Sequence, residues 1–344
     1  MRKSVSMTNT NTNLNIKTQS VTADASEELH VPFLLKPAGK DYLWGGTRLR
    51  DDFAKDFDFN PLAETWECST HPDGQSLVAS GMYEGQYLKD VLESHPEFIG
   101  THPQMKDGLP VLVKFIDAKA DLSIQVHPDD AYAAEHENGS LGKMECWYIL
   151  DAKEGGTIVI GHNAKNHEEV EEMIRGKRWK EFIREIPVKK GDFFQINPGC
   201  VHAIKGGTLI LETQQNSDIT YRVYDYDRLQ DGKPRALHVQ QSIDVIKAPF
   251  EQAVAEHEKL DVEGAKAEKL VSCPCYTVCK ATVNGTAEFD WNQPFVDISV
   301  LDGEGSFDGT PVKKGTHLIV PACYGKMKAE GKNLMMIYSY ITEK

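Results

Sequence analysis

Positive charge is scarce in this sequence, since 38 Lys and Arg residues stand against 52 Asp and Glu residues, for a net charge of -14. A nucleic acid is therefore excluded as the partner, because phosphate backbones bind basic surfaces. Long hydrophobic runs are also missing. No segment approaches the roughly 18 apolar residues of a membrane span, so we expect no membrane association. The 7 cysteines, an odd number in a long chain, indicate a reducing compartment, the cytoplasm, and not a disulfide framework.

The first 30 residues lack large apolar side chains and are rich in Asn, Thr and Ser, which predicts a disordered tail over residues 1–30. Arg2 and Lys3 resemble the start of a signal peptide, but no apolar segment follows them. We therefore do not expect secretion, and the Ser-rich, acid-poor start leaves an organellar transit peptide as the alternative. The remaining length predicts two domains, over residues 31–250 and 251–344, with the boundary in a charge-rich stretch.

Short apolar runs broken by Gly and Pro predict a mainly β fold with peripheral helices. An internal repeat indicates duplicated β units, because VKKGDFFQINPGCVHAI at 188–204 is echoed by VKKGTHLIVPACYGKM at 312–327. Four residues after the proline, the first copy has His202 and the second has Gly325. We therefore predict one unit with a site and one silent copy. Helices are expected over residues 86–99, after Pro128, after Asn166 and over residues 238–246.

Residues 123–147, SIQVHPDDAYAAEHENGSLGKMECW, have the pattern of two strands around a short helix. Alternate side chains of a strand share a face, so Ser123, Gln125 and His127 point one way and the apolar residues between them point the other. The second strand repeats this alternation, and its polar face carries Lys143, Glu145 and Trp147. A polar inner face with an apolar outer face is typical of a β-barrel whose interior is a binding site.

Gln125, His127, Glu145 and His202 are candidate metal ligands if their three segments are neighbouring strands. Two imidazoles and one carboxylate suit zinc or another first-row divalent metal and leave positions open for water or substrate. The alternatives are a solvated loop histidine for His202 and an ion pair between Glu145 and Lys143 on an exposed strand face. These alternatives explain each residue separately, whereas one metal site explains all of them together. The metal site is therefore the preferred hypothesis.

Five segments together resemble the type I mannose-6-phosphate isomerases, in the short bacterial form without a large helical insertion. They are LLKPAGKDYLWGG, SIQVHPDD, GKMECWYI, NPGCVHAIKGG and LETQQNSDITYRVYDYDR. The resemblance is close over residues 31–245 and looser over 246–344. It implies two cupin-like (jelly-roll) β-barrels, the second degenerate and without a metal site, and one zinc ion per chain. The implied activity interconverts two sugar phosphates, mannose 6-phosphate and fructose 6-phosphate, in a monomer or weak homodimer.

The resemblance also implies roles for individual residues. The implied metal ligands are Gln125, His127, Glu145 and His202. The residues that match the phosphate end of the substrate are Lys114, Ser123 and Arg228. The residues that match positions near the reacting carbons are Lys143, Glu212 and Arg222. Trp147, on the same strand face as Glu145, is a further candidate for the wall of the site.

Aldose-ketose isomerisation moves a proton between two carbons through an enediol. A metal would polarise the carbonyl or stabilise the enediolate, and Arg222 would add positive charge at the developing oxyanion. The base is open among Glu212, Lys143 and a metal ligand such as His202. We favour Glu212, because a metal-bound imidazole has already committed its lone pair.

Two other functions fit part of the pattern. A non-haem iron oxygenase also uses two histidines and a carboxylate, but here one of the usual cupin histidines is Gln125 and Glu145 lies far downstream. A non-catalytic sugar-binding cupin is the other alternative. For Arg222 and Arg228, the alternative role is a surface ion pair with Asp225 or Asp227.

Cysteine clustering near the predicted second domain has a simpler explanation than a metal site. The residues concerned are Cys273, Cys275 and Cys279. A structural zinc site normally has four ligands, so we expect these residues to be buried, reduced cysteines on a strand.

Overall fold

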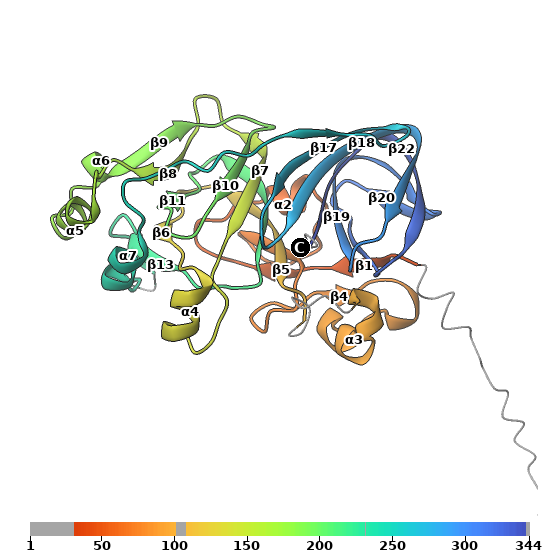
Figure 1. The fold of residues 1–344 in the computed structure, drawn as a ribbon, viewed down its shortest axis with the longest axis horizontal. Helices are drawn as coiled ribbons and strands as arrows, with labels where there is room; N and C mark the ends of the chain where they lie inside the picture. Colours follow the sequence, from red (N-terminus) through yellow and green to blue (C-terminus); the bar gives the residue numbers. More distant parts are fainter. Residues whose placement is uncertain (1–30, 101–107, 231, 342–344) are drawn as a thin grey trace, which may run out of the picture.

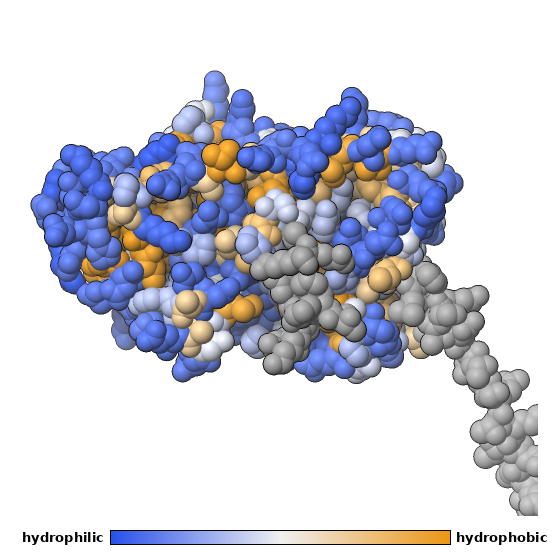
Figure 2. All heavy atoms as spheres, in the orientation of Figure 1, coloured by the Kyte–Doolittle hydropathy of each residue, from blue (hydrophilic) through white to orange (hydrophobic). Residues whose placement is uncertain are grey.

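The computed structural model describes residues 31–100, 108–230 and 232–341, and the predicted tail over residues 1–30 lies outside them. Figure 1 shows two β-rich units side by side, with the C-terminal strands in blue on the right and the small helices at the periphery. The mainly β fold with peripheral helices is confirmed. On the face shown in Figure 2, hydrophilic residues cover most of the surface and hydrophobic residues form separate small groups.

The first unit is built from two antiparallel sheets. The larger one has the order β10 (Phe193–Ile196), β7 (Glu145–Ala152), β12 (Thr208–Gln215), β5 (Val111–Ala118), β3 (Glu64–Cys68) and β2 (Ala38–Lys40). The smaller one has the order β13 (Tyr221–Tyr224), β6 (Ile124–Val126), β11 (His202–Ala203), β8 (Thr157–His162) and β9 (Ile183–Pro187). A separate hairpin pairs β14 (Leu229–Gln230) with β15 (Lys233–Pro234).

In the part of the chain that the structure describes, the two sheets of the first unit do not close into a continuous barrel. Among the described residues, no strand of one sheet pairs with a strand of the other. Strands β6 and β11 have only 3 and 2 residues. Pro128 comes shortly after β6, and Pro198 comes shortly before β11. Proline has no N–H to donate to a β ladder, so pairing ends there and the two sheets face each other instead.

The second unit is one nine-stranded antiparallel sheet that also includes N-terminal strands. Its order is β16 (Glu258–Leu260), β17 (Ala265–Ser272), β18 (Thr277–Trp291), β22 (Gly325–Tyr340), β19 (Val296–Phe307), β21 (His317–Val320), β1 (Phe33–Lys36) and β4 (Leu77–Val78), with β20 (Thr310–Lys313) beside β19. Phe33 on β1 lies opposite Ile319 on β21. Strand pairing therefore crosses the predicted domain boundary at residue 250, and that division remains a prediction.

The repeated VKKG segments adopt the same turn. In both copies the N–H of the first lysine donates to a side chain three residues later, to Asp192 Oδ2 over 2.9 Å and to Thr316 Oγ1 over 3.1 Å. Gly191 and Gly315 have φ values of 90° and 89°, a left-handed backbone that glycine adopts without strain. The sequence repeat is thus a structural repeat as well.

Six helices and two short 3₁₀ turns lie in the described part of the chain. They are α2 (Arg48–Asp51), α3 (Leu88–Ser94), α4 (Asp130–His136), α5 (His167–Arg175), α6 (Trp179–Phe182), α7 (Val239–Val245), Gly81–Tyr83 and Pro96–Ile99. Asp129 and Asn166 accept backbone N–H bonds at the N-termini of α4 and α5, as side chains at this position commonly do. No described helix has the length and apolar composition needed to cross a membrane.

A shared hydrophobic core joins the two units. One cluster of buried side chains contains Phe115 from the first unit and Phe33, Tyr276 and Ile319 from the second unit. A second cluster packs Trp147 with residues of the smaller sheet. The side-chain alternation predicted for residues 123–147 is confirmed, because Ile124 and Val126 pack in a different apolar cluster on the outer face.

Candidate metal centre and substrate cavity

Three strands bring the predicted metal ligands together between the two sheets of the first unit. His127 follows the last residue of β6, and Glu145 and His202 are the first residues of β7 and β11. Gln125 lies directly opposite His202 in the β6–β11 pair. Helix α4 lies in the segment between His127 and Glu145. This segment leaves the site after His127 and comes back to it at Glu145.

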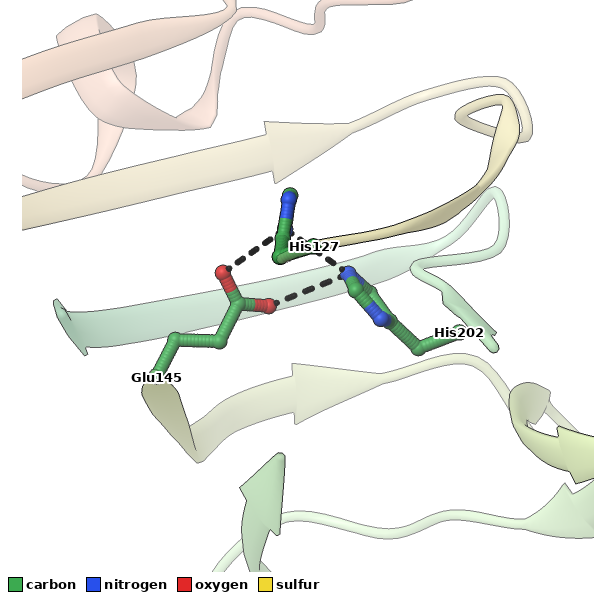
Figure 3. A group of neighbouring side chains, drawn as sticks. All are labelled: His127, Glu145 and His202. Atoms are coloured by element: carbon green, nitrogen blue, oxygen red, sulfur yellow. Dashed lines mark hydrogen bonds and ion pairs between the residues drawn. The ribbon is translucent and has the colours of Figure 1, made fainter. Parts of the chain in front are cut away.

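His127, Glu145 and His202 form a compact buried cluster (Figure 3). One carboxylate oxygen of Glu145, Oε2, is 3.3 Å from His127 Nε2, and the other, Oε1, is 3.3 Å from His202 Nε2. The two Nε2 atoms are 3.1 Å apart. Within the described residues this is the one group of three or more His, Cys, Asp or Glu side chains close enough to share a metal ion.

Backbone carbonyls fix the orientation of both imidazoles. His127 Nδ1 is 2.8 Å from the carbonyl oxygen of Ile219, and His202 Nδ1 is 2.9 Å from that of Cys200. A carbonyl oxygen only accepts, so each Nδ1 carries the hydrogen and each neutral ring directs the lone pair of Nε2 into the cluster.

The electrostatics favour a cation between these groups. Burial lowers the pKa of His127 to about 3 and also lowers the pKa of His202, so both rings stay neutral. For Glu145 burial acts in the opposite direction, but the positive charge of Lys143 holds the pKa of Glu145 well below its ordinary value. Two converging imidazole lone pairs and a carboxylate repel one another until a cation joins them, and this donor set fits a first-row divalent metal.

Gln125 and Lys143 border the cluster. The Gln125 amide nitrogen is 3.2 Å from His202 Nε2, so Gln125 would have to turn its amide oxygen toward the cluster to act as a ligand. Lys143 Nζ is 2.7 Å from Glu145 Oε2 and 3.1 Å from His127 Nε2. The ion pair considered as an alternative for Glu145 therefore exists, but both partners are buried and lie at the cluster.

A cavity of about 300 Å³ opens next to the cluster. It is lined by six of the predicted site residues, namely Lys114, Ser123, Gln125, Lys143, Glu212 and Arg222. The cluster residues His127, Glu145 and His202 are not among its lining residues, and neither are Trp147 and Arg228. Trp147 is buried beneath the surface, where its ring packs edge-on against His202, and Arg228 lies behind the cavity wall.

One wall of the cavity is rich in carboxylates. Lys114 Nζ is 4.0 Å from Glu64, 3.9 Å from Glu212 and 3.8 Å from Asp218. It also lies 4.5 Å from the ring centroid of Trp66, a favourable cation–π geometry. Burial, followed by the charge of Glu145, raises the pKa of Glu212 to about 7.

The facing wall is rich in arginine. Arg222, directly opposite Gln125 in the β13–β6 pair, donates from Nη1 to the carbonyl oxygen of Ala236 over 3.0 Å. Its buried Nε has no hydrogen-bond partner among the described residues. Burial, and then the nearby Arg235, lower the pKa of Arg222. Arg222 is therefore not in the surface ion pair considered as its alternative role, whereas Arg228 does pair with Asp225 over 2.5 Å.

Several cavity residues were not predicted from the sequence. The charged and aromatic ones are Tyr42, Glu64, Asp218, Arg235 and His238. Tyr42 and Asp218 lie inside the quoted motifs, so their position there was an available signal. Arg235 and His238 follow the β14–β15 hairpin, and no local pattern distinguishes them from ordinary surface residues.

Comparison with known proteins agrees with this geometry. Residues 33–157 match the family model for the phosphomannose isomerase type I catalytic domain, and residues 266–341 match the model for the mannose-6-phosphate isomerase cupin domain. The cupin-like architecture predicted from the sequence is thereby confirmed, with open sheets. The family and the His-Glu-His cluster together indicate a metal cofactor.

Relatives match almost the whole chain. Mannose-6-phosphate isomerase ManA of Bacillus subtilis is 44% identical over 308 residues, which cover 87% of this chain and 96% of the relative. Mannose-6-phosphate isomerase of Streptococcus mutans is 42% identical over 317 residues, covering 91% and 99%. The crystal structure of mannose 6-phosphate isomerase from Bacillus subtilis superposes with a TM-score of 0.87 at 40% identity, covering 90% of this chain and 99% of that one. The chain therefore belongs to the type I mannose-6-phosphate isomerase family.

Proposed function

We propose that this protein interconverts mannose 6-phosphate and fructose 6-phosphate through an enediol intermediate. The observation that carries the proposal is the His127, Glu145 and His202 cluster beside a cavity with carboxylates on one wall and arginines on the other. An aldose-ketose isomerase needs a group that stabilises an enediolate, a base for the proton and a cationic site for the phosphate. The related isomerases at 42% and 44% identity support this assignment over an oxygenase or a non-catalytic sugar-binding protein.

The metal is proposed to be one zinc ion per chain. His127, Glu145 and His202 would hold it through two imidazole nitrogens and a carboxylate, and Gln125 would add a fourth protein ligand after rotation of its amide. When bound, zinc polarises a carbonyl and stabilises an enediolate as a Lewis acid. Lys143 contacts both Glu145 and His127 and lines the cavity, and it would donate a hydrogen bond to a substrate oxygen.

Glu212 is proposed to carry the proton between the two carbons. Its side chain lines the cavity, and its Oε2 accepts a hydrogen bond from Trp147 Nε1 over 2.9 Å. This bond orients the carboxylate, and burial brings its pKa close to neutral, where a carboxylate is an effective base. His202 directs its lone pair to the metal cluster, which leaves it unable to act as the base. Arg222 would place positive charge beside the developing oxyanion.

The other predicted residues would contact the substrate or support residues that do. Ser123 and Lys114 line the cavity and would contact the sugar phosphate directly. Trp147 would act through Glu212, and Arg228 through its ion pair with Asp225. We also propose that the protein works in the cytoplasm as a monomer or weak homodimer, which sedimentation over a range of concentrations would check.

A coupled assay tests the function. Purified protein is treated with a chelator and assayed with mannose 6-phosphate before and after zinc is restored, with fructose 6-phosphate formation measured through a coupling enzyme. We expect loss of turnover on chelation and recovery with zinc. Undiminished isomerisation in metal-free protein would reject the metal role. Absence of turnover together with oxygen uptake on a candidate substrate would favour the oxygenase alternative.

A further inference from the structure

Two arginines share a single carboxylate at the back of the cavity's cationic wall. Asp225 is 4% exposed and accepts bonds from Arg235 Nε over 2.8 Å, from Arg235 Nη2 over 2.6 Å and from Arg228 Nη2 over 2.5 Å. A guanidinium carries five N–H donors, so Arg235 keeps three of them after these two bonds. Arg222 lines the same cavity, so two bonded arginines and a third arginine stand against the single carboxylate of Asp225 here, a local excess of positive charge in a protein with a net charge of -14.

The two bound arginines differ in what else they contact. Arg228 also donates from Nη1 to the backbone carbonyl of Asp121, and it does not line the cavity. Arg235 does line it, together with Arg222 and Ser123. Arg228 therefore bonds the protein through Nη1 and Nη2 and lies outside the cavity lining, whereas Arg235 lines the cavity and keeps three donors.

The other cavity cation is a weaker candidate for holding a phosphate. Lys114 Nζ has three carboxylates within 4.0 Å, from Glu64, Glu212 and Asp218. A dianionic phosphate placed beside Lys114 would meet those negative charges at short range. On the Arg235 side one carboxylate is already shared by two arginines, so an added dianion meets net positive charge there.

The positions of Gln125 and Ser123 along the chain also favour the Arg235 side for the phosphate. Gln125 borders the metal cluster, and Ser123 lies two residues earlier on the same face, roughly 7 Å farther along the strand. A hexose 6-phosphate carries its phosphate at the opposite end from the carbons that react. The phosphate must therefore lie away from the cluster, on the side of Ser123. Arg235 is on that side, because it bonds Asp225, which follows Tyr224, and Tyr224 pairs with Ile124 next to Ser123.

We propose that Arg235 is the specificity-determining anchor for the 6-phosphate group, oriented by Asp225, and that Arg228 is a positioning residue that acts only through Asp225. This inference rests on the proposed function, because it names the residue that recognises the substrate phosphate. Arg235 binds the phosphate by charge-assisted hydrogen bonds, for which a guanidinium is well suited. Phosphorylated and unphosphorylated sugars are then distinguished mainly by this one side chain.

The test compares Arg235→Gln, Arg235→Lys and Arg228→Gln in steady-state kinetics with mannose 6-phosphate. We expect Arg235→Gln to raise KM roughly 10- to 100-fold while kcat changes far less, because the lost bonds are charge-assisted and remote from the reacting carbons. Arg235→Lys restores part of the affinity. Arg228→Gln has the smaller effect on KM, because Arg228 only helps to hold Asp225 in position. Equal effects of the Arg228 and Arg235 substitutions would reduce both residues to structural partners of Asp225 and overturn the proposal.

Direct binding separates phosphate recognition from turnover. The probes are a 6-phosphorylated hexitol and the same hexitol without phosphate, measured by calorimetry on metal-loaded protein. The wild-type preference for the phosphorylated hexitol should fall at least tenfold in Arg235→Gln, and an unchanged preference would refute the anchor. If the wild-type protein fails to isomerise mannose 6-phosphate but Arg235→Gln still loses this preference, the proposed function falls and the anion anchor stands.

Arg48→Gln is the matched control. Arg48 also bonds a buried aspartate, Asp117, through Nε over 2.7 Å, and its side chain is 26% exposed against 19% for Arg235. It lies outside the cavity, so its loss should leave the hexitol preference unchanged. A similar loss of preference in Arg48→Gln would show that general destabilisation explains the Arg235 result, and thermal unfolding of all variants checks this independently.

Discussion

Trp147 and Glu212 lie directly opposite each other on β7 and β12, and the indole N–H of Trp147 donates to Glu212 Oε2 over 2.9 Å. The row continues across the sheet, because Glu212 is opposite Lys114 and Lys114 is opposite Trp66. Trp66 in turn donates to Glu64 Oε2 over 2.7 Å. Lys114 thus lies between the carboxylates of Glu64 and Glu212, and each carboxylate accepts a hydrogen bond from an indole. These bonds restrict the positions open to Glu212, the proposed base.

Replacing Trp147 by Phe should therefore impair catalysis through Glu212. Loss of a donor to the ionised carboxylate is expected to lower kcat about tenfold, the effect of one bond to a charged group. It should also raise the pKa of Glu212, because the bond favours the charged form, so the acidic limb of the kcat profile moves to higher pH. Trp291→Phe, a buried tryptophan of the second unit, is the control. An unshifted pH profile in Trp147→Phe would argue against this coupling.

Glu212→Gln should abolish most of the activity while the metal stays bound. A general base typically contributes about 10² to 10⁴ in rate, so a loss of that size is expected in kcat. In the wild type, burial raises the pKa of Glu212 to about 7, and the base works only when ionised. The rate should therefore increase as pH rises through about 7, and this limb should vanish in the variant. Near-normal turnover of Glu212→Gln with full metal content would remove Glu212 as the base.

The sequence predicted the local features of this site because they depend on strand alternation. Ser123 and Gln125 were placed on one face by their spacing, and both line the cavity. His127 and Glu145 were likewise placed inward, and they meet His202 in the buried cluster. Alternation is a property of any extended backbone and needs no knowledge of the distant chain.

Features that depend on long-range packing could not be predicted in this way. Arg228 follows Asp227 and Arg235 follows Pro234 in the same polar stretch, and only the β14–β15 hairpin between them decides which of the two reaches the cavity. Strand β1 pairs with β21, almost at the other end of the chain, through contacts such as Phe33 with Ile319. Sheet closure also depends on which strand edges meet, and no local pattern encodes that choice.

Metal content tests the cluster without reference to turnover. His202→Asn should lower zinc bound per chain by roughly tenfold or more, because it removes one of three converging ligands. His162→Asn is the matched control, since His162 is also buried but bonds the backbone carbonyl of Lys247 at 3.0 Å, away from the cluster. Elemental analysis after dialysis gives the metal content. Retention of zinc by His202→Asn would rule out His202 as a ligand.

A buried acid in the second unit predicts how stability depends on pH. Asp297 on β19 is 2% exposed, accepts a hydrogen bond from Ser339 and lies 4.0 Å from His317 Nε2. Burial raises the pKa of Asp297 to about 7, above the value of about 3.9 for an unfolded chain. The folded protein therefore holds a proton that the unfolded chain releases, and the stabilisation is present below about pH 4 and lost as pH rises through about 7.

Asp297→Asn should remove this contribution, because the amide stays neutral at every pH. Between pH 5 and pH 8 the free energy of unfolding of the wild type should fall relative to that of the variant by roughly 1 to 3 kcal/mol, on a scale of about 1.4 kcal/mol per pH unit for one proton. Urea unfolding at both pH values measures the difference, in which the other titrating groups cancel. Asp261→Asn, at an exposed position, should track the wild type. If the free energy of unfolding of Asp297→Asn changes with pH as that of the wild type does, Asp297 is already ionised in the folded protein at pH 5.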